Sequence, residues 1–162
     1  MTKTALITGA CSGIGLAVTR HLLSKHWSVI LADIRPEAYE GIKASLPPHH
    51  TYIQTDVSSW ESQASLFSQA YTSSGERIDF FHANAGIADR ESLLQPWDLD
   101  AEPTKPNLTC LDVNVVGVMY GLKLFVHYAR KTRRTVSGFE GKMLITASGA
   151  GQYPYVSAAW RG

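Results

Sequence analysis

A glycine-rich stretch, Thr8-Gly9-Ala10-Cys11-Ser12-Gly13-Ile14-Gly15, follows the apolar run 5–7 and leads into an amphipathic segment. A strand, a glycine turn and a helix in this order form a cradle for phosphate groups, because free N–H groups and the positive end of the helix dipole meet at the helix N-terminus. The three glycines would permit the tight turn, the approach of a pyrophosphate and close packing of the helix on the strand. Tight turns also use glycine for conformation alone, so this stretch does not decide the function by itself.

Apolar strands and amphipathic helices alternate along the rest of the chain. We expect strands at 4–9, 28–33, 51–55, 78–82 and 141–147, and helices at 14–25, 36–47, 60–75 and 108–129, with a long loop at 87–106. Unbroken apolar strands that alternate with helices are typical of parallel sheets buried on both faces. The predicted fold class is therefore α/β, a doubly wound parallel sheet with helices on both faces that stops after the fifth strand. Ser58 and Glu61 have capping-box spacing and predict the start of the third helix.

Composition is that of an ordinary globular protein. The chain has 162 residues, 44% of them hydrophobic and 18% charged, and a formal net charge of +1. One domain is expected at 1–157, followed by an atypical tail at 158–162. The near-neutral charge gives no general attraction to nucleic acid or to an anionic membrane. We expect neither a membrane span nor a signal peptide, and therefore a cytoplasmic location.

Cysteine and histidine give no sign of a metal site. Cys11 and Cys110 cannot form a disulfide framework, and the six histidines show no metal-ligand spacing. We therefore expect two reduced thiols and no metal. The basic run 130–134 follows the longest expected helix, where the helix dipole favours cations, and we interpret it as a solvated helix end rather than a nucleic-acid patch.

Polar side chains stand at the ends of three expected strands. Asp33 ends the second strand about 20 residues beyond the glycine turn, where a carboxylate can accept hydrogen bonds from the ribose hydroxyls of a dinucleotide. A carboxylate there would repel a 2′-phosphate, which favours NAD over NADP, although Arg35 could soften that preference. Asp56 and Asn84 follow the third and fourth strands, and parallel sheets bind ligands at the carboxyl ends of their strands.

Taken together, these motifs resemble those of the short-chain dehydrogenase/reductase family. The turn at 8–15 resembles that family's cofactor turn, Asp56-Val57 its adenine contact and Asn84-Ala85-Gly86 its Asn-Ala-Gly motif. One departure is His82-Ala83, which stands where that motif usually has another asparagine. The stretch 106–117 is similar to the 15-hydroxyprostaglandin-dehydrogenase-like branch of the family.

The resemblance extends from Thr4 to about Pro154 and implies a Rossmann-type fold that binds a nicotinamide dinucleotide. NAD is expected rather than NADP. The cofactor-binding residues that the resemblance implies are Gly9, Ser12, Gly13, Ile14, Gly15, Asp33, Asp56, Val57, Asn84, Ala85 and Gly86.

The family's reaction is hydride transfer between the nicotinamide and an alcohol or carbonyl carbon. A serine binds the substrate oxygen, a tyrosine exchanges its proton, a lysine lowers the pKa of that tyrosine, and a helix asparagine holds a relay water. Ser148 and Asn114 match the serine and the asparagine. From the residues alone, Ser148 could equally be a turn residue at a strand end. The amide of Asn114, within an apolar helix stripe, needs a buried partner, which suits either a relay or a structural cap.

The family's tyrosine and lysine have no counterpart. They would fall near positions 161 and 165, whereas the sequence there reads Ala158-Ala159-Trp160-Arg161-Gly162. Tyr153 and Tyr155 are too close to Ser148 and have no lysine four residues on, so neither is assigned as a catalyst. We interpret the chain as truncated before the Tyr-x-x-x-Lys motif, which would leave the fifth strand as an apolar sheet edge and makes the family's usual tetramer doubtful.

Three functions remain open. The first is an NAD(P)-dependent oxidoreductase for a small alcohol or ketone, such as a tailoring step in a biosynthetic pathway, impaired because the loss of a general acid–base group costs about 10²–10⁴ in rate. The second is a catalytically silent dinucleotide-binding module that associates with itself or with a full-length relative. The third is a non-functional remnant that does not fold stably. Expected partners are a dinucleotide and the small substrate, with neither nucleic acid nor membrane.

Overall fold

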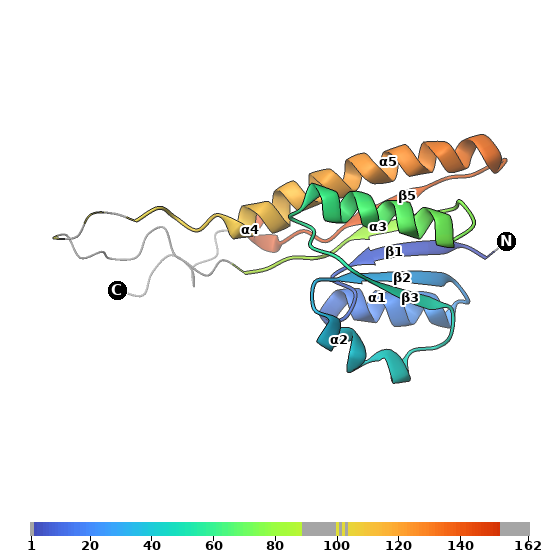
Figure 1. Ribbon diagram of the computed structural model, residues 1–162, viewed down its shortest axis with the longest axis horizontal. Coiled ribbons are helices and arrows are strands. Elements are labelled where there is room, and N and C mark those ends of the chain that lie inside the picture. The colour runs from blue at the N-terminus through green and yellow to red at the C-terminus, as the bar shows by residue number, and fades with distance from the viewer. Residues whose placement is uncertain (1, 89–99, 101, 103, 153–162) are drawn as a thin grey trace.

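The computed structural model describes residues 2–88, 100, 102 and 104–152. Within them, five parallel strands form one sheet in the order β3-β2-β1-β4-β5 (Figure 1). The strands are β1 (Thr4–Thr8), β2 (Ser28–Asp33), β3 (His50–Gln54), β4 (Phe80–Ala83) and β5 (Lys142–Ile145). The predicted α/β doubly wound sheet is confirmed, and its strand order reverses between β1 and β4, where such sheets bind ligands.

Helices lie on both faces of the sheet. They are α1 (Gly13–Ser24), α2 (Pro36–Glu40), α3 (Trp60–Ser73), α4 (Thr109–Leu111) and α5 (Gly117–Thr135), with 3₁₀ turns η1 (Lys43–Ser45) and η3 (Gly149–Gly151) and a π-helical turn η2 (Asp112–Val116). Figure 1 shows α1 and α2 on one side of the sheet and α3 and α5 on the other. The tail at 158–162, Tyr153, Tyr155 and most of the loop 87–106 lie outside the described residues.

Alternate residues of β1 fill the two layers of the core. Leu6 packs in one cluster with Phe67 of α3 and Phe125 of α5. Ile7 packs in a second cluster with Leu23 of α1. All five residues of β1 are buried, because β2 and β4 pair with its two edges and helices cover both its faces.

Local details around α2 and α3 differ from the expected elements. The expected helix at 36–47 is only α2 followed by η1. The third helix is capped by Ser59, whose hydroxyl accepts a hydrogen bond from the Ser62 N–H at 3.1 Å. The capping box predicted for Ser58 and Glu61 is therefore wrong by one residue, because Ser58 instead donates to the carboxylate of Asp56.

The helix expected at 108–129 is longer than predicted. The continuous helix Thr109–Thr135 is long and apolar enough, by length and composition, to cross a membrane, and 22% of its most apolar window is buried. The helix meets this measure although single polar residues such as Asp112 and Lys123 interrupt its apolar run, and the absence of a membrane span stays a prediction. Length and composition do not separate a membrane span from a core helix. Here one side of the helix packs against α3 and β4.

Candidate functional site

The glycine turn has the backbone that its sequence requires. Gly9 and Gly13 have φ angles of 62° and 50°, in the left-handed region that favours glycine. A Cβ on Gly15 would clash with the Gly9 carbonyl oxygen and lie 2.6 Å from Asn84 Nδ2, so α1 approaches the turn closely. A Cβ on Gly13 would meet nothing within 4 Å, and the Ser12 side chain does not cap α1. Space and N–H donors are thus available at the start of α1.

Asp33 joins the end of β2 to this turn. Its side chain is 6% exposed, and its Oδ2 accepts a hydrogen bond from the Cys11 N–H at 3.1 Å. Its Oδ1 accepts from the Arg35 N–H at 3.2 Å and lies 3.9 Å from Arg35 Nε. Two carboxylate oxygens have about four lone-pair sites, so acceptor capacity remains for a further donor. Arg35 also donates to the Ser12 hydroxyl at 3.5 Å, which places a cation beside the turn.

Two neighbours of Asp33 stay protonated at neutral pH. Burial first and the Asp33 charge second raise the pKa of the Cys11 thiol to about 12, against the lowering effect of Arg35. Burial, followed by the charges of Cys11 and Asp33, raises the pKa of Tyr52 to about 12. The Tyr52 hydroxyl donates to the Asp33 carbonyl at 3.0 Å. Cys11 is therefore an inert, packed thiol rather than a nucleophile.

Asp56 and Val57 connect β3 to the helices. Oδ1 of Asp56 accepts from both the N–H and the hydroxyl of Ser58, at 2.9 Å and 2.6 Å. The Val57 carbonyl accepts from Gln63 Nε2 at 2.6 Å, and a Cβ on Gly117 would lie 2.9 Å from that carbonyl oxygen. The Asp56 carboxylate thus holds the turn before α3, and α5 packs closely beside Val57.

Asn84, after β4, is bonded directly to the glycine turn. Its Nδ2 donates to the carbonyls of Thr8 at 3.1 Å and Gly9 at 3.3 Å. The Thr8 hydroxyl accepts from the N–H groups of Asn84 and Ala85, at 3.0 Å and 3.1 Å. The three predicted positions Gly9, Asn84 and Ala85 therefore lie together at the carboxyl edge of the sheet. Asp33 lies at the same edge, at the end of β2 on the other side of β1.

Asn114 lies in the π-helical turn η2, a feature found frequently at functional sites. Its side chain is exposed, and it pairs with the main chain of Ile87: Oδ1 accepts from the N–H at 2.9 Å, and Nδ2 donates to the carbonyl at 2.8 Å. The expectation of a buried partner is therefore wrong, because the helix face that carries Asn114 is exposed in the part of the chain that the structure describes. Gly86 lies alongside, where a Cβ would be 3.3 Å from Asn114 Oδ1.

Ser148 follows β5 and is exposed, and its carbonyl accepts from the Gly151 N–H at 3.1 Å as η3 begins. Sequence reasoning assigned no role to the side chains of three residues at this edge, Thr8, His82 and Thr146, which bond to one another or to Asn84. The signals were a threonine that opens the glycine stretch and a histidine within an apolar strand. Among the described residues, no group of three or more His, Cys, Asp or Glu side chains could hold a metal.

Comparison with known proteins gives one family model and three similar curated proteins. The model of the short chain dehydrogenase family matches residues 3–160. The short-chain dehydrogenase/reductase prx6 of Penicillium rubens is 34% identical over 94% of this chain and 54% of its own length. The 5′-hydroxyaverantin dehydrogenase of Dothistroma septosporum is 34% identical over 93% of this chain and 53% of its own. The NADP-dependent dehydrogenase clz5 of Cochliobolus lunatus is 30% identical over 85% and 50%.

The fold has a counterpart in solved structures. A 3-ketoacyl-(acyl-carrier-protein) reductase from Brucella melitensis, complexed with NADH, superposes with a TM-score of 0.78 and 24% identity over 97% of this chain and 62% of that one. This likeness concerns the fold. The chain spans about half the length of the curated relatives it matches.

Proposed function

The chain belongs to the short-chain dehydrogenase family, and from that premise we propose that it binds a nicotinamide dinucleotide at the carboxyl edge of its sheet, with NAD preferred to NADP. One observation carries this proposal: the glycine turn, Asp33 and Asn84 are tied together by direct hydrogen bonds. A ligand with a pyrophosphate and a ribose fits this combination, because it offers helix N–H groups and a carboxylate side by side.

Each predicted residue has a role in the proposed site. The N–H groups from Gly9 to Gly15 would hold the pyrophosphate, and Asp33 would accept hydrogen bonds from the ribose. Asp56, Val57 and the stretch 84–86 would line the rest of the site, as the family resemblance implies. When bound, the nicotinamide accepts or supplies the hydride.

The preference for NAD rests on charge. The buried Asp33 carboxylate would repel a 2′-phosphate at the ribose, whereas the exposed Arg35 guanidinium nearby would attract one. A carboxylate with 6% exposure is screened less than a guanidinium with 61% exposure, which favours NAD. The Cochliobolus relative is named for NADP, so both dinucleotides belong in the test.

We propose oxidoreduction of a small alcohol or ketone as the reaction of the complete catalytic unit, as a tailoring step in a biosynthetic pathway in the cytoplasm. The name of the Dothistroma relative, a dehydrogenase of a hydroxylated compound, supports this class of substrate. Ser148 would bind the substrate oxygen and Asn114 would hold the relay water, as the family resemblance implies. The 162 residues contain no matching tyrosine and lysine, so we propose that the complete catalytic unit needs these two groups in addition to the residues described.

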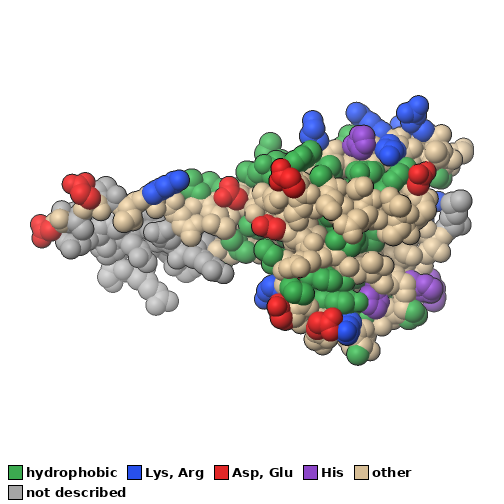
Figure 2. Space-filling model, in the orientation of Figure 1, with side chains coloured by type: hydrophobic (Ala, Val, Ile, Leu, Met, Phe, Trp, Pro, Cys, Tyr) green, Lys and Arg blue, Asp and Glu red, His purple; other side chains and the backbone are tan. Residues whose placement is uncertain are grey.

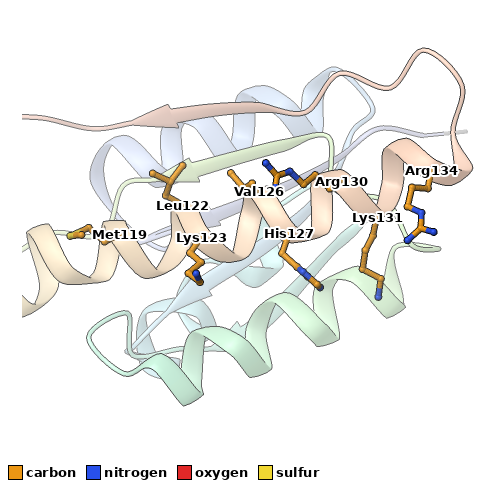
Figure 3. Close-up of a pocket in the computed structure, with 8 residues that line it drawn as sticks. All are labelled: Met119, Leu122, Lys123, Val126, His127, Arg130, Lys131 and Arg134. Carbon is orange, nitrogen blue, oxygen red and sulfur yellow. The ribbon is translucent and has the colours of Figure 1, made fainter.

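A silent binding module that associates with another chain is the second candidate, and one surface supports it. Met119 on α5 is 64% exposed, and Leu144 on β5 is 48% exposed. Figure 2 shows apolar side chains along α5 and basic ones toward its end. A hollow of about 720 Å³ lies along this helix and is lined by α5 residues between Met119 and Arg134. In Figure 3, Leu122 and Lys123 point to opposite sides of the helix. A second copy or a full-length relative would cover this face.

Titration calorimetry tests the binding proposal. The wild-type chain, Asp33→Asn and Glu40→Gln are each titrated with NAD and NADP at a temperature where all three are folded. Glu40 is the matched control, because its exposed carboxylate pairs with Lys43 away from the site. We expect wild type and Glu40→Gln to bind NAD more tightly than NADP. Asp33→Asn should bind NAD about tenfold more weakly than wild type, and its affinities for NAD and NADP should differ less. Tighter binding of NADP by wild type would contradict the assignment of NAD.

A turnover assay separates the two candidates. The same preparation is incubated with the preferred dinucleotide and a panel of secondary alcohols and ketones, and reduction or oxidation of the nicotinamide is followed by absorbance. Slow turnover supports the oxidoreductase. Binding without turnover supports the silent module.

A further inference from the structure

Three side chains form a series of hydrogen bonds between the edge strand β5 and the glycine turn. His82 is in β4, Asn84 follows β4, and Thr146 follows β5. His82 Nε2 lies 2.8 Å from the Thr146 hydroxyl oxygen, and that hydroxyl donates to Asn84 Oδ1 at 3.0 Å. The Thr146 N–H also donates to the Ala83 carbonyl at 3.0 Å, which fixes the threonine beside β4.

The direction of these hydrogen bonds follows from the far end of the series. Asn84 Nδ2 donates to the Thr8 and Gly9 carbonyls, so its Oδ1 must accept. A hydroxyl has one proton, and Thr146 uses it on Asn84. Thr146 must then accept from His82, which places the His82 proton on Nε2 and leaves Nδ1 as an acceptor.

The surroundings of His82 agree with this tautomer. The side chain is 1% exposed, and Nδ1 is buried with no hydrogen-bond partner among the described residues. An N–H at that position would be an unsatisfied buried donor, and proteins tolerate such donors less often than under-satisfied acceptors. Burial also lowers the pKa of His82, which keeps the ring neutral.

The orientation of the Asn84 amide determines its contacts with the glycine turn. Besides its two hydrogen bonds, its Nδ2 lies where a Cβ on Gly9 would be 3.1 Å away and a Cβ on Gly15 would be 2.6 Å away. The amide therefore occupies the space that the glycines leave open. A rotation of this amide would replace a donor by an acceptor opposite two carbonyls and disturb the turn.

We propose that Thr146 is a positioning residue for the dinucleotide site: its hydroxyl, set by His82, fixes the amide of Asn84 and through it the shape of the glycine turn. The consequence for binding rests on the proposed function, whereas the effect on the turn does not. Because Thr146 is itself exposed, water competes for its hydroxyl, and the effect of its loss should be moderate rather than complete.

Four chains test this role: wild type, Thr146→Val, Thr146→Ser and Thr132→Val. Valine keeps the shape of Thr146 and removes the hydroxyl, and serine keeps the hydroxyl. Thr132 is the control, because its hydroxyl bonds the Glu76 and Tyr128 carbonyls at the far end of α5. Two quantities are measured: the dissociation constant for NAD by calorimetry, and the hydrogen-exchange rate of a peptide covering 8–16 in the ligand-free protein.

We expect Thr146→Val to weaken NAD binding about three- to tenfold and to speed exchange in the turn, with both effects reversed by serine. Thr132→Val should lower the thermal midpoint and leave both quantities unchanged. Faster exchange in Thr146→Val, when wild type itself binds no dinucleotide, would refute the proposed function and uphold the positioning role. Unchanged exchange and affinity in Thr146→Val, or equal losses in the serine variant, would overturn it.

Discussion

Strands β1 and β5 are similar in sequence character and opposite in environment. In β1, Leu6 and Ile7 are fully buried between helices on both faces. In β5, Leu144 and Ile145 are 48% and 46% exposed, and within the described sheet the strand pairs only with β4. An apolar strand is stable in water only when neighbouring elements cover it. β1 and β5 therefore differ in the elements that pack against them rather than in the apolar character of their residues.

The same contrast divides the candidate site. The glycine turn, Asp33 and Asn84 surround β1 and are held by buried or partly buried hydrogen bonds. Ser148, after β5, and Asn114, in η2, are exposed. Within the described residues, hydrogen bonds therefore hold the part of the site assigned to the dinucleotide, whereas the two residues assigned to the substrate side are exposed. Substitutions on the two sides should have different consequences for stability, binding and association.

Leucine truncation in the two strands should give the largest contrast. Leu6→Ala removes a fully buried side chain and should lower the free energy of unfolding by about 2–5 kcal/mol. Leu144→Ala removes a half-exposed side chain and should lower it by less than about 1 kcal/mol. Urea unfolding followed by tryptophan fluorescence measures both. Equal losses would show that β5 is covered in solution.

Gly15→Ala should be the next largest change. The new Cβ would meet the Gly9 carbonyl oxygen and Asn84 Nδ2, so the turn must shift, at a cost of about 3 kcal/mol and with loss of detectable NAD binding. Gly41→Ala is the matched control, because its Cβ would have its nearest contact at 3.6 Å and its backbone is helical. That control should leave stability within about 1 kcal/mol. Full NAD affinity in Gly15→Ala would exclude the turn as the binding site.

A charge on the exposed face of α5 should change self-association of the chain more than its free energy of unfolding. Met119→Lys places a cation on the exposed face of α5 and should weaken self-association about tenfold, with less than about 0.5 kcal/mol of change in unfolding. Gln69→Lys on the exposed side of α3 is the control for added charge. Sedimentation velocity over a range of concentrations measures the effect. A monomeric wild type, or identical behaviour of the two variants, would contradict an association surface on α5.

The smallest effect concerns pH. Burial lowers the pKa of His82 below its ordinary value of 6.5, so below that pH the unfolded chain binds more protons than the folded one. The contribution of neutral His82 to stability is thus complete above pH 6.5 and is lost as the pH falls toward the lowered pKa. His82→Gln should show a shallower decrease in unfolding free energy between neutral and mildly acidic pH. Parallel curves for the two proteins would mean that His82 is not held neutral.

The sequence allowed the strands, the doubly wound fold and the glycine turn to be predicted, because those depend on local pattern. Asp33 and Asn84 could be placed at one edge because the carboxyl ends of parallel strands meet there. Contacts between distant segments could not be predicted in the same way. Thr146 and Asn84 are 62 positions apart, and nothing in either neighbourhood specifies the other.

Local competition explains two further differences. Ser58 and Ser59 are equally good N-cap residues, and the Asp56 carboxylate decides between them by binding Ser58. Asn114 was expected to have a buried partner from its place in an apolar stripe, but periodicity shows only which residues share a face. Whether that face is covered depends on the neighbouring elements, which leave this part of the helix exposed.

Thermal unfolding with and without millimolar dinucleotide tests the central claim most directly, because a ligand that binds only the folded state raises the midpoint. The claim is that the β1 side forms a working dinucleotide site in this chain. It predicts one cooperative transition whose midpoint rises with NAD, rises less with NADP and is unaffected by either in Gly15→Ala. Absence of a transition, or no shift of the wild type with either dinucleotide, would contradict it and leave a chain of dehydrogenase ancestry without a functional site.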